Sequence, residues 1–265
     1  MKSLCLAFLT SFMISLKADA FTLNNSGGLI FGKNEVSVHV ANGNCANIGI
    51  DENELLLIVG NAVDQYWNQS PTSRLKLRKG SLQNLSSAYK TDAICTNNSL
   101  AASSDTCTPN TDLSVSSDIL ITCNDNASNF SSSGVLAVTV PNNIVGNSII
   151  GSLIMINDSS SNQFKLKSYD EKVSIIAHEI GHAFGLGHSP VKDSLMYYST
   201  VDMRKNLGFD DIDGISYLYP KQQPISCGSI TEKTTPNSLT GMIIGLLLAS
   251  FIRYQLRYLK LRPRF

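Results

Sequence analysis

The chain has 265 residues and a formal net charge of zero, with 21 basic and 21 acidic side chains. Only 16% of its residues are charged and no basic patch lies in its middle part, which excludes the electrostatic footprint of a nucleic-acid-binding protein. Once the two ends described below are set aside, about 200 residues remain, enough for one domain with a core of its own.

Residues 1–20 are predicted to be a secretory signal peptide. Lys2 precedes an apolar stretch from Leu4 to Leu16, and Ala18-Asp-Ala20 matches the A-x-A pattern of a cleavage site. A buried N-terminal helix is the alternative, but the segment has no amphipathic pattern. The mature chain would therefore begin at Phe21, outside the cytoplasm.

Strand and helix patterns alternate in the first part of the mature chain. Glu35–Val40 and Arg74–Arg78 alternate as strands. Between them, residues 51–68 are predicted to be a helix that ends before Pro71. Apolar residues recur at helical spacing in this segment: Leu55, Ile58, Val59, Ala62, Val63 and Tyr66.

Residues 80–133 are rich in Ser, Asn and Asp and are predicted to form long loops, interrupted by one strand at Asp118–Cys123. Four cysteines fall in the domain: Cys45, Cys95, Cys107 and Cys123. An even number of cysteines in an exported chain predicts two disulfides, in any one of three connectivities. Metal ligation by these cysteines is the weaker alternative, because no C-x-x-C pair occurs.

The last part of the domain is predicted to contain two strands and two helices. Val135–Val140 and Ser148–Asn157 have strand patterns, and helices are expected from about Asp170 and from about Asp210.

Three of the four histidines lie within eleven residues, in His178-Glu-Ile-Gly-His-Ala-Phe-Gly-Leu-Gly-His188. A helix turns 100° per residue, so His178 and His182 lie about 40° apart, one turn above each other, and both can reach one metal ion. Glu179 points beside that ion, which suits a general base.

His188 cannot join the other two histidines by continuing the helix, since six residues would carry it roughly 9 Å along the axis. The chain must turn back, and Gly185 permits that turn because glycine tolerates a left-handed conformation. Three neutral imidazoles leave a fourth tetrahedral position open for water, which is typical of catalytic zinc. A solvated helix with incidental histidines is the alternative, and Gly185 and His188 argue against it. His39 lies in an alternating strand and is predicted to be a sheet residue.

The extended motif H-E-x-x-H-x-x-G-x-x-H resembles that of the metzincin metallopeptidases. His188-Ser189 after Gly-Leu-Gly is most similar to the matrixin branch, Ser194-Leu-Met-Tyr-Tyr198 supplies the Met-turn methionine Met196, and Leu207–Tyr219 resembles the last matrixin helix. The resemblance implies an α+β domain in which a twisted mixed sheet packs on long helices beside a zinc cleft.

In the matrixin family an antiparallel edge strand beside the cleft pairs with extended substrate. Val135–Val140, or the segment leading into Asn157, would fill that role here. Two departures from the family are expected. The mature chain enters the domain without a cysteine-switch propeptide, and a second, structural zinc is not expected with only His39 left over. Calcium sites are possible but not readable from the scattered Asp and Asn residues.

Residues 238–254 are predicted to cross a membrane, after a linker at 223–237 that follows the catalytic domain (21–222). Leu239–Ile252 carries no charge, and with its flanks the segment reaches about 17 residues, the short end for a span. The 13 residues from Arg253 contain five basic side chains and no acidic one, so the tail at 255–265 is predicted to be cytoplasmic.

Other interpretations of the C-terminus are a peripheral amphipathic helix, which the unbroken apolar run argues against, and a removed glycolipid-anchor signal, which would end in its apolar segment. The layout also resembles bacterial C-terminal sorting signals, so cleavage after export stays open.

The sequence therefore predicts an exported, membrane-anchored zinc endopeptidase with one catalytic zinc at His178, His182 and His188 and protein or peptide substrates. A catalytically inactive surface binding module that keeps the fold is the alternative, although such a module should have lost Glu179. Sequence does not separate a narrow processing enzyme from a broad matrix-degrading one.

Tyr198 occupies the position where matrixins commonly have proline. Other metzincin branches place a tyrosine there, and its hydroxyl can stabilise the oxyanion. The alternative is that Tyr198 only lines the specificity pocket.

Overall fold

The computed structural model describes residues 21–43, 45–97, 108–199 and 203–221. The predicted signal peptide, linker, membrane segment and basic tail lie outside the described residues, as does Cys107. Within the described part of the chain, no helix has both the length and the apolar character that crossing a membrane requires.

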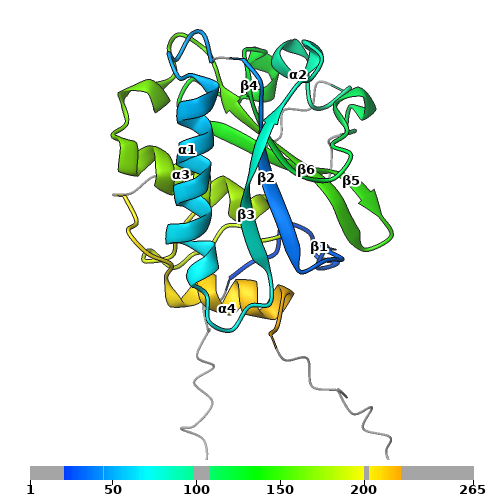
Figure 1. Cartoon of the computed structure of the whole chain (residues 1–265), viewed down its shortest axis with the longest axis vertical. Coiled ribbons are helices and arrows are strands. Elements are labelled where there is room, and N and C mark those ends of the chain that lie inside the picture. Colours follow the sequence, from blue (N-terminus) through cyan, green and yellow to red (C-terminus); the bar gives the residue numbers. More distant parts are fainter. Residues whose placement is uncertain (1–20, 44, 98–107, 200–202, 222–265) are drawn as a thin grey trace, which may run out of the picture. The chain divides into compact units, whose positions relative to one another are not determined.

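A six-stranded mixed sheet organises the fold (Figure 1). Its strands are β1 (Ile30–Phe31), β2 (Glu35–Ala41), β3 (Lys76–Gln83), β4 (Asp118–Asn124), β5 (Ala137–Val145) and β6 (Ser148–Asn157). Five strands are parallel, in the order β1-β6-β4-β2-β3, and β5 pairs antiparallel with β6. β4 and β6 have near-continuous apolar sequences because both faces of these inner strands are covered.

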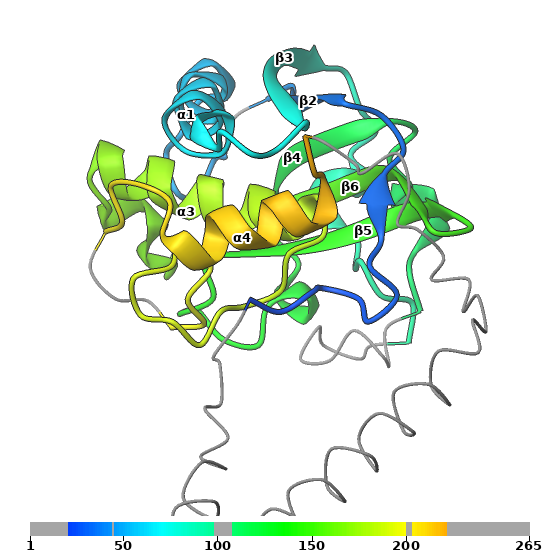
Figure 2. The same ribbon diagram turned by 90° about the horizontal axis from the view of Figure 1, so that it is seen from below.

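The helices α1 (Glu52–Gln65) and α3 (Tyr169–Ala183) lie side by side on one face of the sheet (Figures 1 and 2). The helix α4 (Phe209–Leu218) lies across the lower end of the domain in Figure 1, and its buried residues join the main hydrophobic core, which lies between α1, α3 and the sheet. The expected mixed sheet packed on helices is therefore confirmed. Both long helices begin at a capping side chain, Asp51 for α1 and Ser168 for α3.

The opposite face of the sheet carries a smaller core under loops and short helices. These short elements carry no periodic pattern that the sequence could reveal. Around the smaller core they are α2 (Ala88–Thr91) and the 3-10 turns η2 (Thr111–Leu113) and η3 (Ala127–Asn129), whereas η1 (Trp67–Gln69) and η4 (Gln163–Leu166) contribute Trp67 and Phe164 to the main core. β1 has only two residues, which is too short for a periodic pattern to indicate a strand.

The first helix is shorter than the predicted segment 51–68. α1 ends at Gln65, and the chain tightens into η1. Trp67 is fully buried, its Nε1 donates to the carbonyl of Ala177 at 2.7 Å, and its ring meets Phe184 edge-on at 4.7 Å between centroids. The packing of Trp67 against α3 thus ends the helix at Gln65, although the apolar pattern of the sequence predicts a longer one.

The strand predicted at Arg74–Arg78 begins later and runs further, through Gly80 to Gln83. A side chain at Gly80 would collide with His39 Nδ1 at 2.6 Å and with the carbonyl oxygen of Val38 at 2.8 Å. Gly80 therefore lets the strand pass close to β2, where His39 Nδ1 accepts from the backbone N–H of Ser81 at 3.1 Å. His39 lies in the sheet, as expected.

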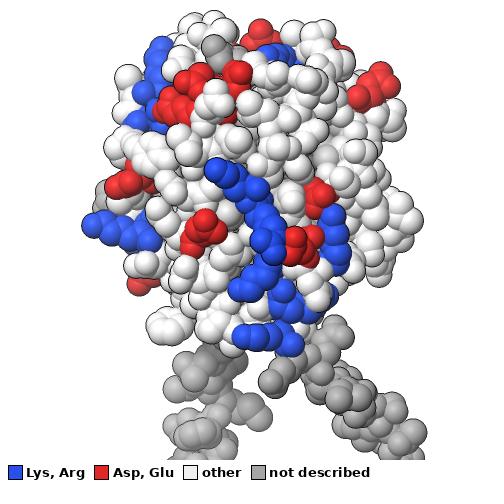
Figure 3. Space-filling view, viewed as in Figure 1, with Lys and Arg blue, Asp and Glu red and all other residues white. Residues whose placement is uncertain are grey.

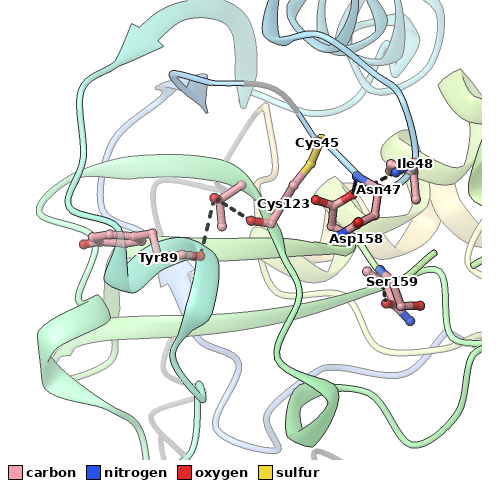
Figure 4. Close-up of a disulfide and its surroundings, with 9 residues drawn as sticks. Cys45, Asn47, Ile48, Tyr89, Cys123, Asp158 and Ser159 are labelled. Carbon is pink, nitrogen blue, oxygen red and sulfur yellow. Dashed lines mark hydrogen bonds between the residues drawn. A yellow bond between two sulfur atoms is a disulfide. The ribbon is translucent and has the colours of Figure 1, made fainter.

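A disulfide joins Cys45, after β2, to Cys123 in β4, with 5.4 Å between Cα atoms (Figure 4). This pairing reduces the three possible connectivities to one, and Cys95 is also disulfide-bonded. Beside the bridge, the buried carboxylate of Asp158 accepts the N–H groups of Asn47 and Ile48, each at 3.0 Å. The loop leading into α1 is thus fixed to the ends of β4 and β6.

Lys and Arg side chains form a stripe across the face drawn in Figure 3. β3 contributes exposed Lys76, Arg78 and Lys79 to the surface, and Arg78 pairs with Glu35. Among the described strands, β3 pairs only with β2, so it is an edge of the sheet. Charged side chains on an edge strand oppose pairing with another chain.

Candidate metal centre

The helix α3 positions two of the predicted ligands. A capping box fixes its start, since Ser168 and Glu171 exchange side chain to backbone hydrogen bonds. The apolar face of α3 is buried in the core, which leaves His178 and His182 at the border of the cleft. Their rings lie edge to face, 4.8 Å apart between centroids, as expected for neighbours one turn apart.

After α3 the chain turns back at Gly185, which has a φ of +122°. A side chain there would meet the carbonyl oxygen of Leu29 at 2.5 Å, so both the conformation and the space require glycine. The turn is closed by the N–H of Leu186, which donates to the carbonyl of Gly181 at 3.0 Å. His188 thereby returns to the same side as the helical histidines.

The three histidines converge through their Nε2 atoms. His182 Nε2 lies 3.2 Å from His178 Nε2 and 3.3 Å from His188 Nε2. Two nitrogens bound tetrahedrally to zinc at about 2.05 Å would lie about 3.3 Å apart, so the spacing fits this ion. Within the described residues, this is the only group of three His, Cys, Asp or Glu side chains close enough to share an ion.

Backbone carbonyls orient the two helical imidazoles. His178 Nδ1 lies 2.7 Å from the oxygen of Leu195, and His182 Nδ1 lies 2.8 Å from that of Leu186. Because a carbonyl only accepts, each Nδ1 carries the proton and each Nε2 keeps its lone pair for a metal. Burial, with the nearby His178 and His188, lowers the pKa of His182 well below its ordinary value. Burial and His178 also lower the pKa of His188, so neutral ligands are favoured.

Glu179 lies beside the histidine cluster at the border of the cleft. Its Oε2 accepts a hydrogen bond from Thr139 Oγ1 of β5 at 2.5 Å. Burial raises the pKa of Glu179, while His178 and the Thr139 hydroxyl act in the opposite direction. A carboxylate next to three convergent imidazoles, but not itself part of the cluster, is arranged to exchange protons with a molecule in the cleft.

The sequence model of the matrixin family matches residues 102–220. Over these residues, which make up less than half of the chain, the sequence is similar to the matrixin family. The expected resemblance is thus confirmed for the segment that contains the histidine cluster.

Individual relatives match shorter segments. Metalloendoproteinase 4-MMP of Arabidopsis thaliana is 40% identical over 68 residues, 25% of this chain and 20% of the relative. Stromelysin-2 of Rattus norvegicus is 49% identical over 49 residues, 17% and 10% of the two chains. Matrix metalloproteinase-19 of Homo sapiens is 42% identical over 62 residues, 23% and 12%. The matched segments therefore span a fifth or less of these relatives.

The Met-turn packs against α3 at Gly181, a residue of the histidine motif. Met196 is buried, and a side chain at Gly181 would collide with its Sδ and with the ring of Trp67. Gly181 is therefore the residue that lets Met196 approach the helix backbone. The H-E-x-x-H pattern leaves this position open, so sequence analysis did not identify it.

Asp211 is a second residue that sequence analysis missed. Its buried carboxylate accepts the Ser194 hydroxyl and the N–H groups of Leu195, Met196 and Gly208, the last three at 2.6, 3.0 and 2.7 Å. Since the carbonyl of Leu195 orients His178, Asp211 supports the metal centre through the Met-turn. The only sequence signal was an acidic residue in the first turn of the last helix.

Two cavities flank the histidine cluster. One, of about 370 Å³, is bordered by Leu136, Ala137, His178, Glu179 and Tyr198, and the other, of about 740 Å³, by Ala137, Thr139, Glu179 and His182. β5 borders both cavities and is the antiparallel strand, whereas β6 is an inner strand. Of the two segments considered for substrate pairing, only β5 therefore presents an edge to the cleft.

Tyr198 lines the smaller cavity. Tyr198 is 63% exposed, and its ring contacts that of Tyr197 at a tilt of 42°, with 4.5 Å between centroids. His39 lies on β2 and belongs to neither cavity lining.

Proposed function

We propose that this chain is a zinc-dependent endopeptidase in which His178, His182 and His188 hold the ion. The observation that carries the proposal is the convergence of three Nε2 atoms at zinc spacing, with two of the rings oriented by backbone carbonyls. A bound zinc ion would supply Lewis acidity toward the scissile carbonyl and lower the pKa of the attacking water.

Glu179 is the general base of the proposed reaction. Its carboxylate accepts a proton from water and passes that proton to the amine that leaves when the peptide bond breaks. The position of Glu179 supports this role, because its side chain borders both cavities and lies next to the ligands on α3.

An extended protein or peptide substrate would add a strand to the β5 edge. Backbone hydrogen bonds to this strand hold a substrate with little regard to sequence, while pockets select side chains. The two cavities on either side of Glu179 are the regions where substrate side chains on each side of the scissile bond would lie.

The test is cleavage of an unbiased peptide library by the full chain, with and without a chelator. Glu179→Ala should keep one zinc per chain and lose cleavage by several orders of magnitude, whereas His182→Ala should lose both. A zinc-free but folded Glu179→Ala protein would contradict the ligand assignment. A wild-type chain that binds zinc and cleaves nothing in the library would favour the binding-module alternative.

We also propose that the domain at residues 21–222 is exported and tethered through residues 238–254. The supports are the signal-like N-terminus, the apolar run and the basic tail at 255–265. Protease added outside intact cells should remove the domain and spare a tag fused after Phe265. Digestion of that tag together with the domain would overturn this orientation.

A further inference from the structure

A hydroxyl group from the sheet edge reaches the carboxylate of the proposed general base. Thr139 lies on β5, opposite Ile154 of β6, and its Oγ1 is 2.5 Å from Glu179 Oε2 and 3.4 Å from the carbonyl oxygen of Glu179. Among the described residues, no other side chain donates a hydrogen bond to this carboxylate. The contact joins two segments 40 positions apart in the sequence.

The direction of the Thr139 side chain follows from the alternation of a strand. Val138 and Val140 pack into the smaller core on the far face of the sheet, so Ala137 and Thr139 point the other way, toward α3. Ladder pairing along β6 fixes the backbone of Thr139, and its β-branched side chain has few accessible rotamers. The hydroxyl is therefore a donor held in a fixed position.

Glu179 needs such a donor more than the histidines do. The helix fixes only its backbone, whereas the carboxylate is carried on three rotatable bonds. The imidazole rings of His178 and His182 are each oriented by a backbone carbonyl, whereas the carboxylate of Glu179 is oriented by the hydroxyl of Thr139. A hydrogen bond from a hydroxyl to a carboxylate is charge-assisted and is short and strong among protein hydrogen bonds.

We propose that Thr139 is a positioning residue for Glu179, holding Oε2 so that Oε1 is presented to the reacting water. This inference rests on the proposed peptidase function. The Thr139 proton is not transferred: the proton from water goes to Oε1 and then to the leaving amine, while Thr139 continues to donate to Oε2. Because Thr139 lies on the strand that would pair with substrate, one segment sets the position of both the peptide and the base.

The first experiment compares the kinetics of three full-chain variants. Thr139→Val keeps the shape and removes the hydroxyl, and it should lower kcat by about 10–100-fold, the usual effect of losing an orienting partner, with KM within about twofold. Thr139→Ser restores the hydroxyl and should recover most of kcat. Thr122→Val is the matched control, because it removes a buried strand hydroxyl that makes only contacts of 3.3 Å or more, away from the site.

A second measurement does not depend on activity. In zinc-free protein with ¹³C-labelled glutamate, the Glu179 carboxyl resonance is identified by its loss in Glu179→Gln. It should shift in Thr139→Val, return in Thr139→Ser and stay unchanged in Thr122→Val. An unshifted resonance in Thr139→Val would overturn the inference, and so would an unchanged kcat in an active enzyme.

The two measurements separate this inference from the proposed function. In one outcome the wild type cleaves no peptide, but the Glu179 resonance shifts in Thr139→Val and returns in Thr139→Ser. The peptidase proposal then fails. The hydrogen bond to Glu179 has only a structural role in that case, which overturns the positioning claim. If the enzyme is active and Thr139→Ser is as slow as Thr139→Val, the threonine methyl group matters rather than the hydroxyl, and the inference fails alone.

Discussion

The two edges of the sheet, β3 and β5, differ in the charge of their side chains. The β3 edge carries exposed Lys76 and Arg78 and lies far along the sheet order from the metal centre. The β5 edge carries no charged residue over its nine positions, and it borders two cavities beside Glu179. One edge is thus protected by charge against pairing with another chain, and the other is left open where pairing would place a peptide in the cleft.

The largest effect is expected from a change that weakens the metal centre beside the β5 edge. Asp211→Ala would leave the N–H groups of Leu195, Met196 and Gly208 without their acceptor, which should cost about 3 kcal/mol of unfolding free energy. Zinc affinity should also fall about 10–100-fold, because the Met-turn carbonyl orients His178. Denaturant unfolding and zinc titration measure the two effects.

Asp213→Asn is the control for this prediction, since Asp213 is an exposed residue of the same helix. It should leave both stability and zinc affinity almost unchanged. Equal losses in the two variants would show that α4 charge, rather than the buried network of Asp211, supports the metal centre.

A more selective change involves Tyr198, which lines the smaller cavity beside the open edge. Its exposure and its place in the smaller cavity favour a pocket-lining role, so Tyr198→Phe should keep kcat within about twofold, while Tyr198→Ala should change which side chains are preferred beside the scissile bond. Library cleavage measures the preference. A loss of about 10²–10³ in kcat for Tyr198→Phe would instead assign the hydroxyl to the oxyanion.

The protected edge can be tested by removing its charges. Replacement of Lys76 and Arg78 by Val should promote self-association, visible by sedimentation velocity, and should leave kcat unchanged because β3 is remote from the cleft. The same number of charges removed at Lys165 and Lys192, which are exposed outside the sheet, should not cause association. If both double variants associate equally, net charge rather than edge protection explains solubility.

The smallest expected effect lies between the two edges, at Asp158. Burial raises the pKa of Asp158, and nearby Asp125 adds to this, although the N–H groups of Ile48 and Asn47 oppose it. Its contribution to stability is therefore present below the ordinary aspartate pKa of about 3.9 and is lost as the pH rises through the higher folded value. Asp158→Asn keeps the acceptor and should flatten this part of the pH dependence in chelated protein. An identical slope in both proteins would rule out a titrating Asp158.

Sequence patterns predicted the elements that carry strong periodicity. The helices expected near Asp170 and Asp210 begin one residue earlier, and Ser148–Asn157 is a strand over its whole predicted length. For the disulfides, the sequence left three connectivities open, because connectivity depends on which loops lie close together in the fold. Pattern analysis also left two substrate strands open, since an edge strand and an inner strand can have similar apolar sequences.

Features that arise from contacts distant in sequence could not be predicted. α1 stops at Gln65 because Trp67 turns under α3, and β3 continues past Gly80 because His39 accepts from Ser81. The histidine motif indicated a metal site by its spacing alone. Two residues that support it, Asp211 and Thr139, contact Met196 and Glu179 at separations of 15 and 40 positions, and no local pattern marks these contacts.

The close approach of Gly181 and Met196 has a consequence for chemical durability. Methionine on a protein surface is readily converted to its sulfoxide, a polar group that a packed core does not tolerate. Met196 is 2% exposed, and its sulfur faces the helix backbone at Gly181. Peroxide therefore reaches this sulfur only when the layer beneath the metal centre opens, so the rate of Met196 oxidation measures how often that opening occurs.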